Sequence, residues 1–353
     1  MKFVHVADMH FDTTFDSLKG TLGEKRRLEQ REVFNKMIEY IKNNDIKFLL
    51  ISGDLYEQKY IRESTIEYIN NKFKEIIDTK IFISPGNHDP FLKNSYYNNY
   101  NWSENVKIFN NKLEKVSLED VDIYGYGFND FYCRADELQN FEIENKDKLN
   151  ILVIHGTLDG SVSMDNQYNP MQSAMLKSKG FDYIALGHIH KNNINENTNI
   201  IYPGSMISMG FDELGEHGMV VGDIKKNDLK LEFLKLDPKE FVEYELDITD
   251  VNSKENLIEI LNNLYIPENN LYKIILNGTR NFEINLQEIM GLLENNKILK
   301  IKNFTKLKFN LEEISNEISL RGFFVKNLLE KQKSGEYVDK EVEKALEIGL
   351  EIL

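Results

Sequence analysis

The sequence contains few cysteine, proline and tryptophan residues and no long hydrophobic run. Its single cysteine, Cys133, excludes an intramolecular disulfide and any metal site built from several thiolates. No uninterrupted apolar stretch approaches the roughly 18 residues of a membrane span, and the one before Asp8 is too short for a signal peptide. We find no internal repeat and no low-complexity segment. We therefore expect a cytoplasmic protein, and the lone cysteine agrees with a reducing compartment.

The chain also has fewer basic residues than acidic ones, with 43 Lys and Arg against 58 Asp and Glu. The formal net charge of −15 argues against the broad basic surface of a protein that grips nucleic acid unaided. A bound pair of divalent cations would, however, add about four positive charges at one place. The length of 353 residues and the hydrophobic content of 41% allow a sizeable core and predict two domains.

Histidine is concentrated in short motifs that each follow an apolar run. Five of the seven histidines lie in such motifs. The motifs are Asp8-Met9-His10, Gly53-Asp54, Gly86-Asn87-His88-Asp89, His155-Gly156 and Gly187-His188-Ile189-His190. The apolar runs before them indicate buried strands, so the motifs should gather on loops along one edge of a sheet.

The motif residues offer carboxylate, imidazole and amide ligands for two divalent metal ions. The candidate ligands are Asp8, His10, Asp54, Asn87, His155, His188 and His190. Oxygen and imidazole ligands without thiolate suit Mn²⁺, Fe²⁺ or Zn²⁺ better than Mg²⁺, and we expect Mn²⁺. Because only two of these ligands are charged, the centre would stay electropositive, attract a phosphate and lower the pKa of a bridging water. The nucleophile would then be a metal-bridging hydroxide.

His88 and Asp89 are the expected catalytic pair. His88 directly follows the ligand Asn87, so its ring would lie beside the metals without binding them. That position suits a proton donor to the leaving oxygen, with Asp89 orienting the imidazole. The two histidines outside the motifs carry no such role: His5 is expected in the core, and His217, within Gly215–Gly218, in a turn.

The sequence pattern predicts a catalytic domain over residues 1–236 and a smaller domain over 237–353. Expected elements of the first include helices at 26–43 and 64–78, the latter capped by Ser64 or Thr65, and a strand at 116–128 with a bend at Gly125 and Gly127. A hairpin over 219–234 would close it. The second should contain strands at 241–248, 271–276 and 299–309, helices at 254–264 and 286–293, and a helical tail from 311.

These motifs resemble those of the calcineurin-like metallophosphoesterases, and among them the SbcD type of DNA repair nuclease, including its YhaO-like branch. The metal motifs cover residues 8–190. The nuclease resemblance rests on residues 3–12, on 51–56, on Tyr202-Pro203-Gly204-Ser205 and on the second domain. It implies an α/β protein with a two-layer β-sandwich flanked by helices, a smaller α/β capping domain and a helical C-terminus.

The resemblance also implies roles for individual residues. One ion would be held by Asp8, His10, Asp54 and His190, and the other by Asp54, Asn87, His155 and His188. His88 matches the catalytic histidine of the family. In nucleases of this family a second histidine commonly follows the Gly-Asp motif, whereas this chain has Glu57 near that position. The departure bears on exonuclease polarity and duplex preference and leaves the metal ligands intact.

The resemblance implies a DNA substrate and a partner, an ATPase of the SbcC type with a long coiled coil. Such a partner would supply the basic surface that this chain lacks, and association of two copies of the chain is left open. Lys300, Lys302, Lys306 and Lys308 would share one face of the 299–309 strand. That face could follow a phosphate backbone, although a solvated strand face accounts for the same pattern.

Three alternatives to a DNA phosphodiesterase need weighing. A phosphodiesterase for small molecules such as cyclic nucleotides requires the same metals and fits the acidic charge. A protein phosphatase is disfavoured because residues 53–58 lack the arginine that such enzymes carry after Gly-Asp. A non-catalytic adaptor is disfavoured because a binding module does not need His88.

Overall fold

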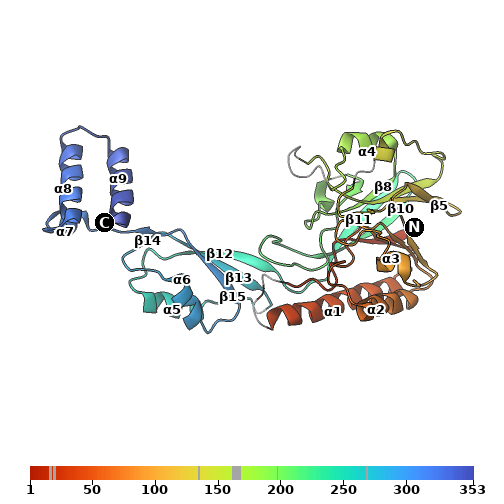
Figure 1. Cartoon of the computed structure of the whole chain (residues 1–353), viewed down its shortest axis with the longest axis horizontal. Coiled ribbons are helices and arrows are strands. Elements are labelled where there is room, and N and C mark those ends of the chain that lie inside the picture. Colours follow the sequence, from red (N-terminus) through yellow and green to blue (C-terminus); the bar gives the residue numbers. More distant parts are fainter. Residues whose placement is uncertain (16–17, 19–20, 134–135, 161–167, 197, 268) are drawn as a thin grey trace. The chain divides into compact units, whose positions relative to one another are not determined.

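The computed structural model describes residues 1–15, 18, 21–133, 136–160, 168–196, 198–267 and 269–353 (Figure 1). Contacts divide the chain into two compact units, Met1–Glu240 and Phe241–Leu353. Each unit is described by itself below.

Two packed β-sheets form the centre of the first unit. The six-stranded sheet has the order β11-β10-β1-β2-β3-β4, in which β1 to β4 are parallel and β10 and β11 antiparallel. Its strands are β1 (Lys2–Val6), β2 (Phe48–Ile51), β3 (Lys80–Ile83), β4 (Val106–Ile108), β10 (Gly218–Lys225) and β11 (Asp228–Lys235). In the five-stranded sheet, neighbouring strands are consecutive along the chain. They are β5 (Glu114–Ser117), β6 (Val121–Tyr126), β7 (Leu149–His155), β8 (Tyr183–Gly187) and β9 (Ile200–Ile201).

Strand periodicity explains how the two sheets pack. Phe3, Leu50 and Phe82 of the first sheet share one buried cluster with Ile151 and Val153 of the second. Alternate residues of the same strands, such as Leu49 and Leu152, are also fully buried, which requires a covered outer face on each sheet. The fold is thus a two-layer sandwich flanked by helices, as the resemblance implied.

Helices provide this cover. They are α1 (Leu22–Asn43), α2 (Glu63–Lys74), α3 (Tyr96–Asn99) and α4 (Ser173–Lys179), with 3₁₀ turns η1 (Asp136–Gln139) and η3 (Ile194–Glu196). The first two lie alongside each other in Figure 1 and pack through Phe34 and Phe73. Leu176 of α4 joins Leu152 in the cluster on the outer face of the five-stranded sheet. Burial of these apolar faces stabilises the layered arrangement.

Two local predictions for this unit were wrong. The expected strand at 116–128 is a hairpin, with β5 and β6 paired around residues 118–120 rather than bent at Gly125. Gly125 is needed because the ring of Phe109 occupies the space of a Cβ there. Helix α2 begins after Arg62, without a side-chain hydrogen bond at its N-cap, so neither Ser64 nor Thr65 caps it.

The second unit contains a parallel three-stranded sheet, β12-β13-β15, with two helices and a two-stranded ladder. Its elements are β12 (Phe241–Asp247), α5 (Lys254–Asn262), β13 (Leu271–Asn277), β14 (Thr279–Arg280), α6 (Leu286–Leu292), β15 (Ile298–Asn303) and β16 (Lys306–Leu307). The expected single strand over 299–309 is therefore interrupted. The side chain of Asn303 accepts hydrogen bonds from the N–H and hydroxyl of Thr305 and turns the chain.

This interruption separates the four lysines that the pattern put on one strand. Lys300 and Lys302 belong to β15, which pairs with β13, whereas Lys306 belongs to β16, which pairs with β14. A continuous lysine face on one strand is absent from this described segment.

The chain ends in helices α7 (Leu311–Ser315), α8 (Leu320–Lys333) and α9 (Asp339–Ile352). The last two lie side by side in Figure 1. They bury Val325 of α8 with Val342 and Leu346 of α9 in a separate apolar cluster. Among the described residues, no helix has the length and apolar character required to cross a membrane.

Candidate metal centre

The candidate ligands lie where strands of both sheets end. Asp8 follows β1, Asp54 follows β2, Asn87 follows β3, His155 is the last residue of β7, and His188 comes directly after β8. Parallel strands bring their carboxyl ends to one edge of a sheet. The ligand atoms of Asp8 lie within 4.8 Å of those of His10 and His190 in one group, and of Asp54 and His155 in another.

Three lone pairs converge in the first group. Nδ1 of His10 lies 2.7 Å from Glu57, and Nδ1 of His190 lies 2.6 Å from Glu213, so each Nδ1–H donates to a carboxylate. In the neutral rings both Nε2 atoms then carry lone pairs. These two atoms are 3.3 Å apart, and Oδ2 of Asp54 is 3.7 Å from Nε2 of His10. A cation between them would satisfy all three, so the residues fit a metal ion.

The second group shows the same pattern around His155. Its Nδ1 lies 2.8 Å from the carbonyl oxygen of Ser52, which can only accept, so Nδ1 carries the proton. Its Nε2 faces Oδ1 of Asn87 at 3.0 Å and Oδ2 of Asp54 at 3.4 Å. Nδ1 of His188 is 3.2 Å from the same Asn87 oxygen. This arrangement fits a second cation, with Asp54 lying between the two groups.

Backbone conformation supports the convergence. Asp8, His10, Asp54 and His188 all have positive φ, at 51°, 48°, 53° and 108°. Such conformations cost on the order of 1–3 kcal/mol each in non-glycine residues and gather at functional sites. Gly86 is required next to them, because a Cβ there would collide with the carboxylate of Asp54.

Glu57 connects two histidines of the site. Its Oε1 contacts His10, and its Oε2 lies 3.0 Å from Nδ1 of His88. Burial opposes protonation of His88, but the hydrogen bond with Glu57 and the charge of Asp54 raise its pKa to about 9. Burial likewise opposes ionisation of Glu57, yet its bonds with His10 and His88 lower its pKa to about 2. The His88 side chain is 45% exposed, so it can reach a substrate.

Asp89, the expected partner of His88, has other contacts. Its two oxygens accept hydrogen bonds from the backbone N–H groups of Asp54, Leu55 and Gly86 and from the hydroxyl of Tyr97. The carboxylate that holds the His88 imidazole is Glu57, and Asp89 fixes the loop that carries Asp54. Burial and the neighbouring Asp54 charge raise the pKa of Asp89 to about 6.

Comparison with known proteins identifies the family of the chain. The description "Calcineurin-like phosphoesterase" matches residues 1–192, more than half of the chain. The chain belongs to the calcineurin-like phosphoesterase family. It is accordingly a metal-dependent phosphoester hydrolase with a metallophosphoesterase fold, and the candidate ligand groups lie within the matched residues.

Two curated relatives and one solved structure are similar to this phosphoesterase. The uncharacterized metallophosphoesterase YhaO of Bacillus subtilis (strain 168) is 24% identical, over 75% of this chain and 67% of its own. The D subunit of the nuclease SbcCD from Staphylococcus epidermidis is 28% identical, over 75% of this chain and 78% of its own. The crystal structure of TT1561 from Thermus thermophilus aligns with a TM-score of 0.38 and 11% identity, covering 67% of this chain and 98% of that one.

Glu213 is a residue of the phosphoesterase site that sequence reasoning missed. Besides His190, it accepts hydrogen bonds from the hydroxyl of Ser205 at 3.0 Å and the N–H of Met209 at 3.1 Å. Burial opposes its ionisation, but the hydrogen bond and charge of His190 lower its pKa. Burial opposes protonation of His190, while Glu213 and Asp8 raise its pKa to about 9, so a cation that binds its Nε2 atom would displace a proton.

The two remaining histidines of the phosphoesterase unit lie outside the ligand groups among the described residues. His5 is fully buried and contacts Ser52 at 2.7 Å and Tyr183 at 2.9 Å, in agreement with a core role. Burial lowers its pKa to about 3. His217 was expected in a turn but is buried immediately before β10, where it contacts Ser205 and the carbonyl oxygen of Glu213.

Proposed function

We propose that this phosphoesterase hydrolyses phosphodiester bonds of DNA at a dinuclear centre, as a nuclease of the SbcD type acting in DNA repair. The ligands include two lone-pair clusters, one formed by the facing atoms of His10, His190 and Asp54, and the other by those of His155, His188, Asn87 and Asp54. One ion would be held by Asp8, His10, Asp54 and His190, and the other by Asp54, Asn87, His155 and His188. Their oxygen and imidazole character favours Mn²⁺, with Fe²⁺ and Zn²⁺ as alternatives. The observation that carries the proposal is the convergence of these lone pairs beside the exposed imidazole of His88.

His88 acts on the leaving group. When bound, the two ions supply a hydroxide nucleophile near neutral pH and stabilise negative charge on the phosphoryl oxygens. Because Glu57 occupies Nδ1 of His88, the Nε2–H is the group directed to the substrate. Burial opposes protonation of this imidazole, but the hydrogen bond with Glu57 raises its pKa, which favours a ring that can donate a hydrogen bond or a proton to the departing ester oxygen.

The backbone around Asp54 maintains this geometry. The N–H of His88 donates to Oδ1 of Asp54 at 2.8 Å, which ties the proton donor to the carboxylate between the two lone-pair clusters. Asp89 holds the same loop through the N–H groups of Asp54 and Gly86. Asp89 is therefore a positioning residue, and His88 is the catalytic residue.

The choice of DNA is supported by the relatives rather than by the overall charge. One relative is named as a component of the nuclease SbcCD, and it aligns with 75% of this chain. We propose that this chain likewise works with a partner protein, an ATPase of the SbcC type with a coiled coil, which would supply most of the grip on DNA. The net charge of −15 favours the rival substrate class, small phosphodiesters such as cyclic nucleotides.

A hydrolysis assay separates these two substrate classes. Purified full-length chain with Mn²⁺ is given a labelled DNA hairpin, a labelled single strand and bis-p-nitrophenyl phosphate, with His88→Ala as control. Cleavage of DNA by the wild type and not by His88→Ala supports the nuclease. If the ATPase partner is also present and DNA stays intact while the small diester is hydrolysed, the nuclease proposal fails and the small-diester function replaces it.

A further inference from the structure

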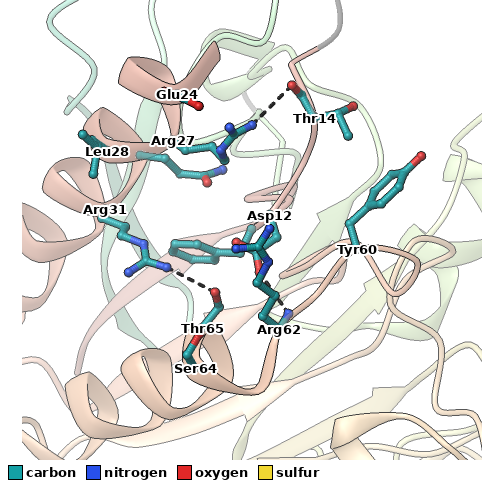
Figure 2. A pocket seen from close by; sticks show the side chains of 12 residues that line it. Asp12, Thr14, Glu24, Arg27, Leu28, Arg31, Tyr60, Arg62, Ser64 and Thr65 are labelled. Carbon is teal, nitrogen blue, oxygen red and sulfur yellow. Dashed lines mark hydrogen bonds between the residues drawn. The ribbon is translucent and has the colours of Figure 1, made fainter. Parts of the chain in front are cut away.

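A polar hollow adjoins the metal centre of the first unit. It has a volume of about 560 Å³ and lies between helix α1 and the start of helix α2 (Figure 2). Three arginines line it: Arg27 and Arg31 from α1, and Arg62 immediately before α2. The chain has a net charge of −15, so a hollow lined by three guanidinium groups is a local exception to its acidic character.

Two of these arginines are held in place by hydrogen bonds to uncharged groups. Nη1 of Arg27 donates to the carbonyl oxygen of Thr14 at 3.4 Å, and Nη2 of Arg31 donates to the hydroxyl of Thr65 at 3.1 Å (Figure 2). Neither these two nor Arg62 forms an ion pair with any carboxylate that the structure describes. The adjacent Arg26 differs, because it is buried against Asp237 and Glu29. The hollow thus keeps hydrogen-bond donors and positive charge available.

The start of helix α2 adds to this potential. The helix spans 12 residues, and its N-cap Arg62 makes no side-chain capping bond. Ser64 and Thr65 of its first turn line the hollow. The N-terminus of a helix carries unsatisfied N–H groups and a partial positive charge, so an anion bound there completes its hydrogen bonding.

Two carboxylates also line the hollow, and the positive charges outnumber them. Oδ2 of Asp12 accepts a hydrogen bond from the backbone N–H of Arg62 at 3.0 Å, and Glu24 is exposed at the start of α1. A single small anion would meet both attraction and repulsion here. A phosphate diester, with one negative charge and several acceptor oxygens, suits this mixture better than a multiply charged anion.

The hollow and the metal centre share two chain segments. Phe11 and Asp12 of the hollow follow the ligand His10 directly, and the carbonyl oxygen of Phe11 accepts from the N–H of Glu57 at 3.0 Å. The carbonyl oxygen of Glu57 in turn accepts from the N–H of Tyr60, which lines the hollow, at 2.9 Å. A strand of linked phosphates could therefore place one phosphate at the metal centre and another in the hollow.

We infer that this hollow, the arginine pocket, binds a phosphate of a nucleic-acid strand other than the phosphate being hydrolysed. The inference rests on the proposed function and names its substrate class as a strand of linked phosphodiesters. A cyclic nucleotide or a simple diester has a single phosphate and gains nothing from the arginine pocket. The single charge of an internal diester suits the arginine pocket better than the higher charge of a terminal monoester, and the experiment separates these two sources.

The test is binding of labelled oligothymidylate, about 20 nucleotides long, to the full-length chain in EDTA, where no hydrolysis occurs. The variant is Arg27→Gln/Arg62→Gln, which spares Arg31 because its guanidinium packs on Tyr68 at 4.9 Å. The matched control is Lys36→Gln/Lys74→Gln, which removes the same charge from exposed positions of the same helices. Strands with a 5′-hydroxyl and a 5′-phosphate are compared, each across a salt series.

We expect the arginine variant to bind about ten-fold more weakly than the control and to lose about 0.7 in the slope of log affinity against log salt for each lost phosphate contact. An equal loss for both strands indicates an internal phosphate, and a loss confined to the 5′-phosphorylated strand indicates a terminal one. Equal affinity of the arginine and lysine variants, or no binding by the wild type, overturns the arginine pocket.

Cleavage with Mn²⁺ then separates this inference from the proposed function. The arginine variant should lose about ten-fold in kcat/KM on DNA, through KM, and keep its rate on bis-p-nitrophenyl phosphate. Arginine-dependent binding by a chain that never cleaves DNA would leave the pocket supported and end the nuclease proposal. DNA cleavage that is the same in wild type and arginine variant would end the pocket proposal alone.

Discussion

Oε2 of Glu57 lies 3.0 Å from Nδ1 of His88, and this contact sets the charge and direction of the proposed proton donor. The sequence motif did not indicate this contact. Asp89 is the acid adjacent to His88, whereas Glu57 lies 31 positions before His88. The pairing leads to the first of the predictions below.

Glu57→Gln should shift the pH dependence of turnover. Burial lowers the pKa of His88, but the hydrogen bond with Glu57 and the charge of Asp54 raise it to about 9, so removal of the Glu57 carboxylate lowers that pKa and the protonated acid is lost at lower pH. The alkaline limb of the kcat profile on bis-p-nitrophenyl phosphate should therefore move to lower pH, with kcat about ten-fold lower at pH 8. An unchanged limb would contradict the role of Glu57, and metal content measured in parallel shows whether His10 still binds.

His88→Ala should separate metal binding from catalysis. Since the imidazole lies outside both lone-pair clusters, the variant should retain its metals and lose on the order of 10²-fold or more in kcat. Plasma mass spectrometry of the purified protein and hydrolysis of the small diester measure the two effects. Activity close to that of the wild type would remove His88 from the mechanism.

Asp54→Ala should disrupt both metal positions. Oδ2 of Asp54 lies 3.7 Å from Nε2 of His10 and 3.4 Å from Nε2 of His155, one in each lone-pair cluster. We expect metal content to fall well below the roughly two ions per chain of a dinuclear site. A full complement of tightly bound metal in this variant would refute the bridging position of Asp54.

Glu213→Ala should weaken metal binding without removing a ligand. The residue holds His190 through Nδ1 and thereby directs Nε2 into the cluster. Loss of such a partner typically costs about 10- to 100-fold in metal affinity, which a competition titration with a chromophoric chelator can measure. Glu216→Ala, on an exposed neighbour, is the matched control and should behave as wild type.

Asp237→Ala should destabilise the first unit. Asp237 is fully buried and pairs with both terminal nitrogens of Arg26, which also donate to Glu29 and to the carbonyl oxygen of Ser208. Removing one partner of such a buried pair costs about 3–5 kcal/mol. Trp102, the single tryptophan of the chain, lies in this unit and reports its unfolding in urea. The exposed Asp228→Ala is the control and should change stability little.

The parts of the fold that follow chain periodicity could be predicted from the sequence. Apolar runs of four to seven residues gave the central strands β1, β2, β3, β7 and β8, because burial on both faces leaves few other choices. Contacts between distant segments could not be predicted in this way. The sequence pattern assigned Gly125 to a bend, whereas the reason for its glycine is the ring of Phe109 from another strand connection.

The same distinction holds for the candidate site. The seven candidate ligands end or follow predicted strands, and the structure brings them together. Glu57 and Glu213 lie in loops, and a loop carboxylate has no periodic signal that would show which imidazole it contacts. Glu213 was missed for this reason. Glu57 was noticed only as a departure from the family histidine, and its contacts with His10 and His88 emerged from the folded geometry.

The order in which the ligands occur along the chain has a consequence for biosynthesis. Asp8 is synthesised before its neighbour His190 and the supporting Glu213, which follow about 180 and 200 positions later. The six-stranded sheet alone holds Asp54 but not His155, which requires β7 of the second sheet. Such long-range pairing forms late in folding. A nascent chain therefore lacks a complete set of candidate ligands until both layers have been synthesised and joined, so the metal centre can form only when the fold that surrounds it is complete.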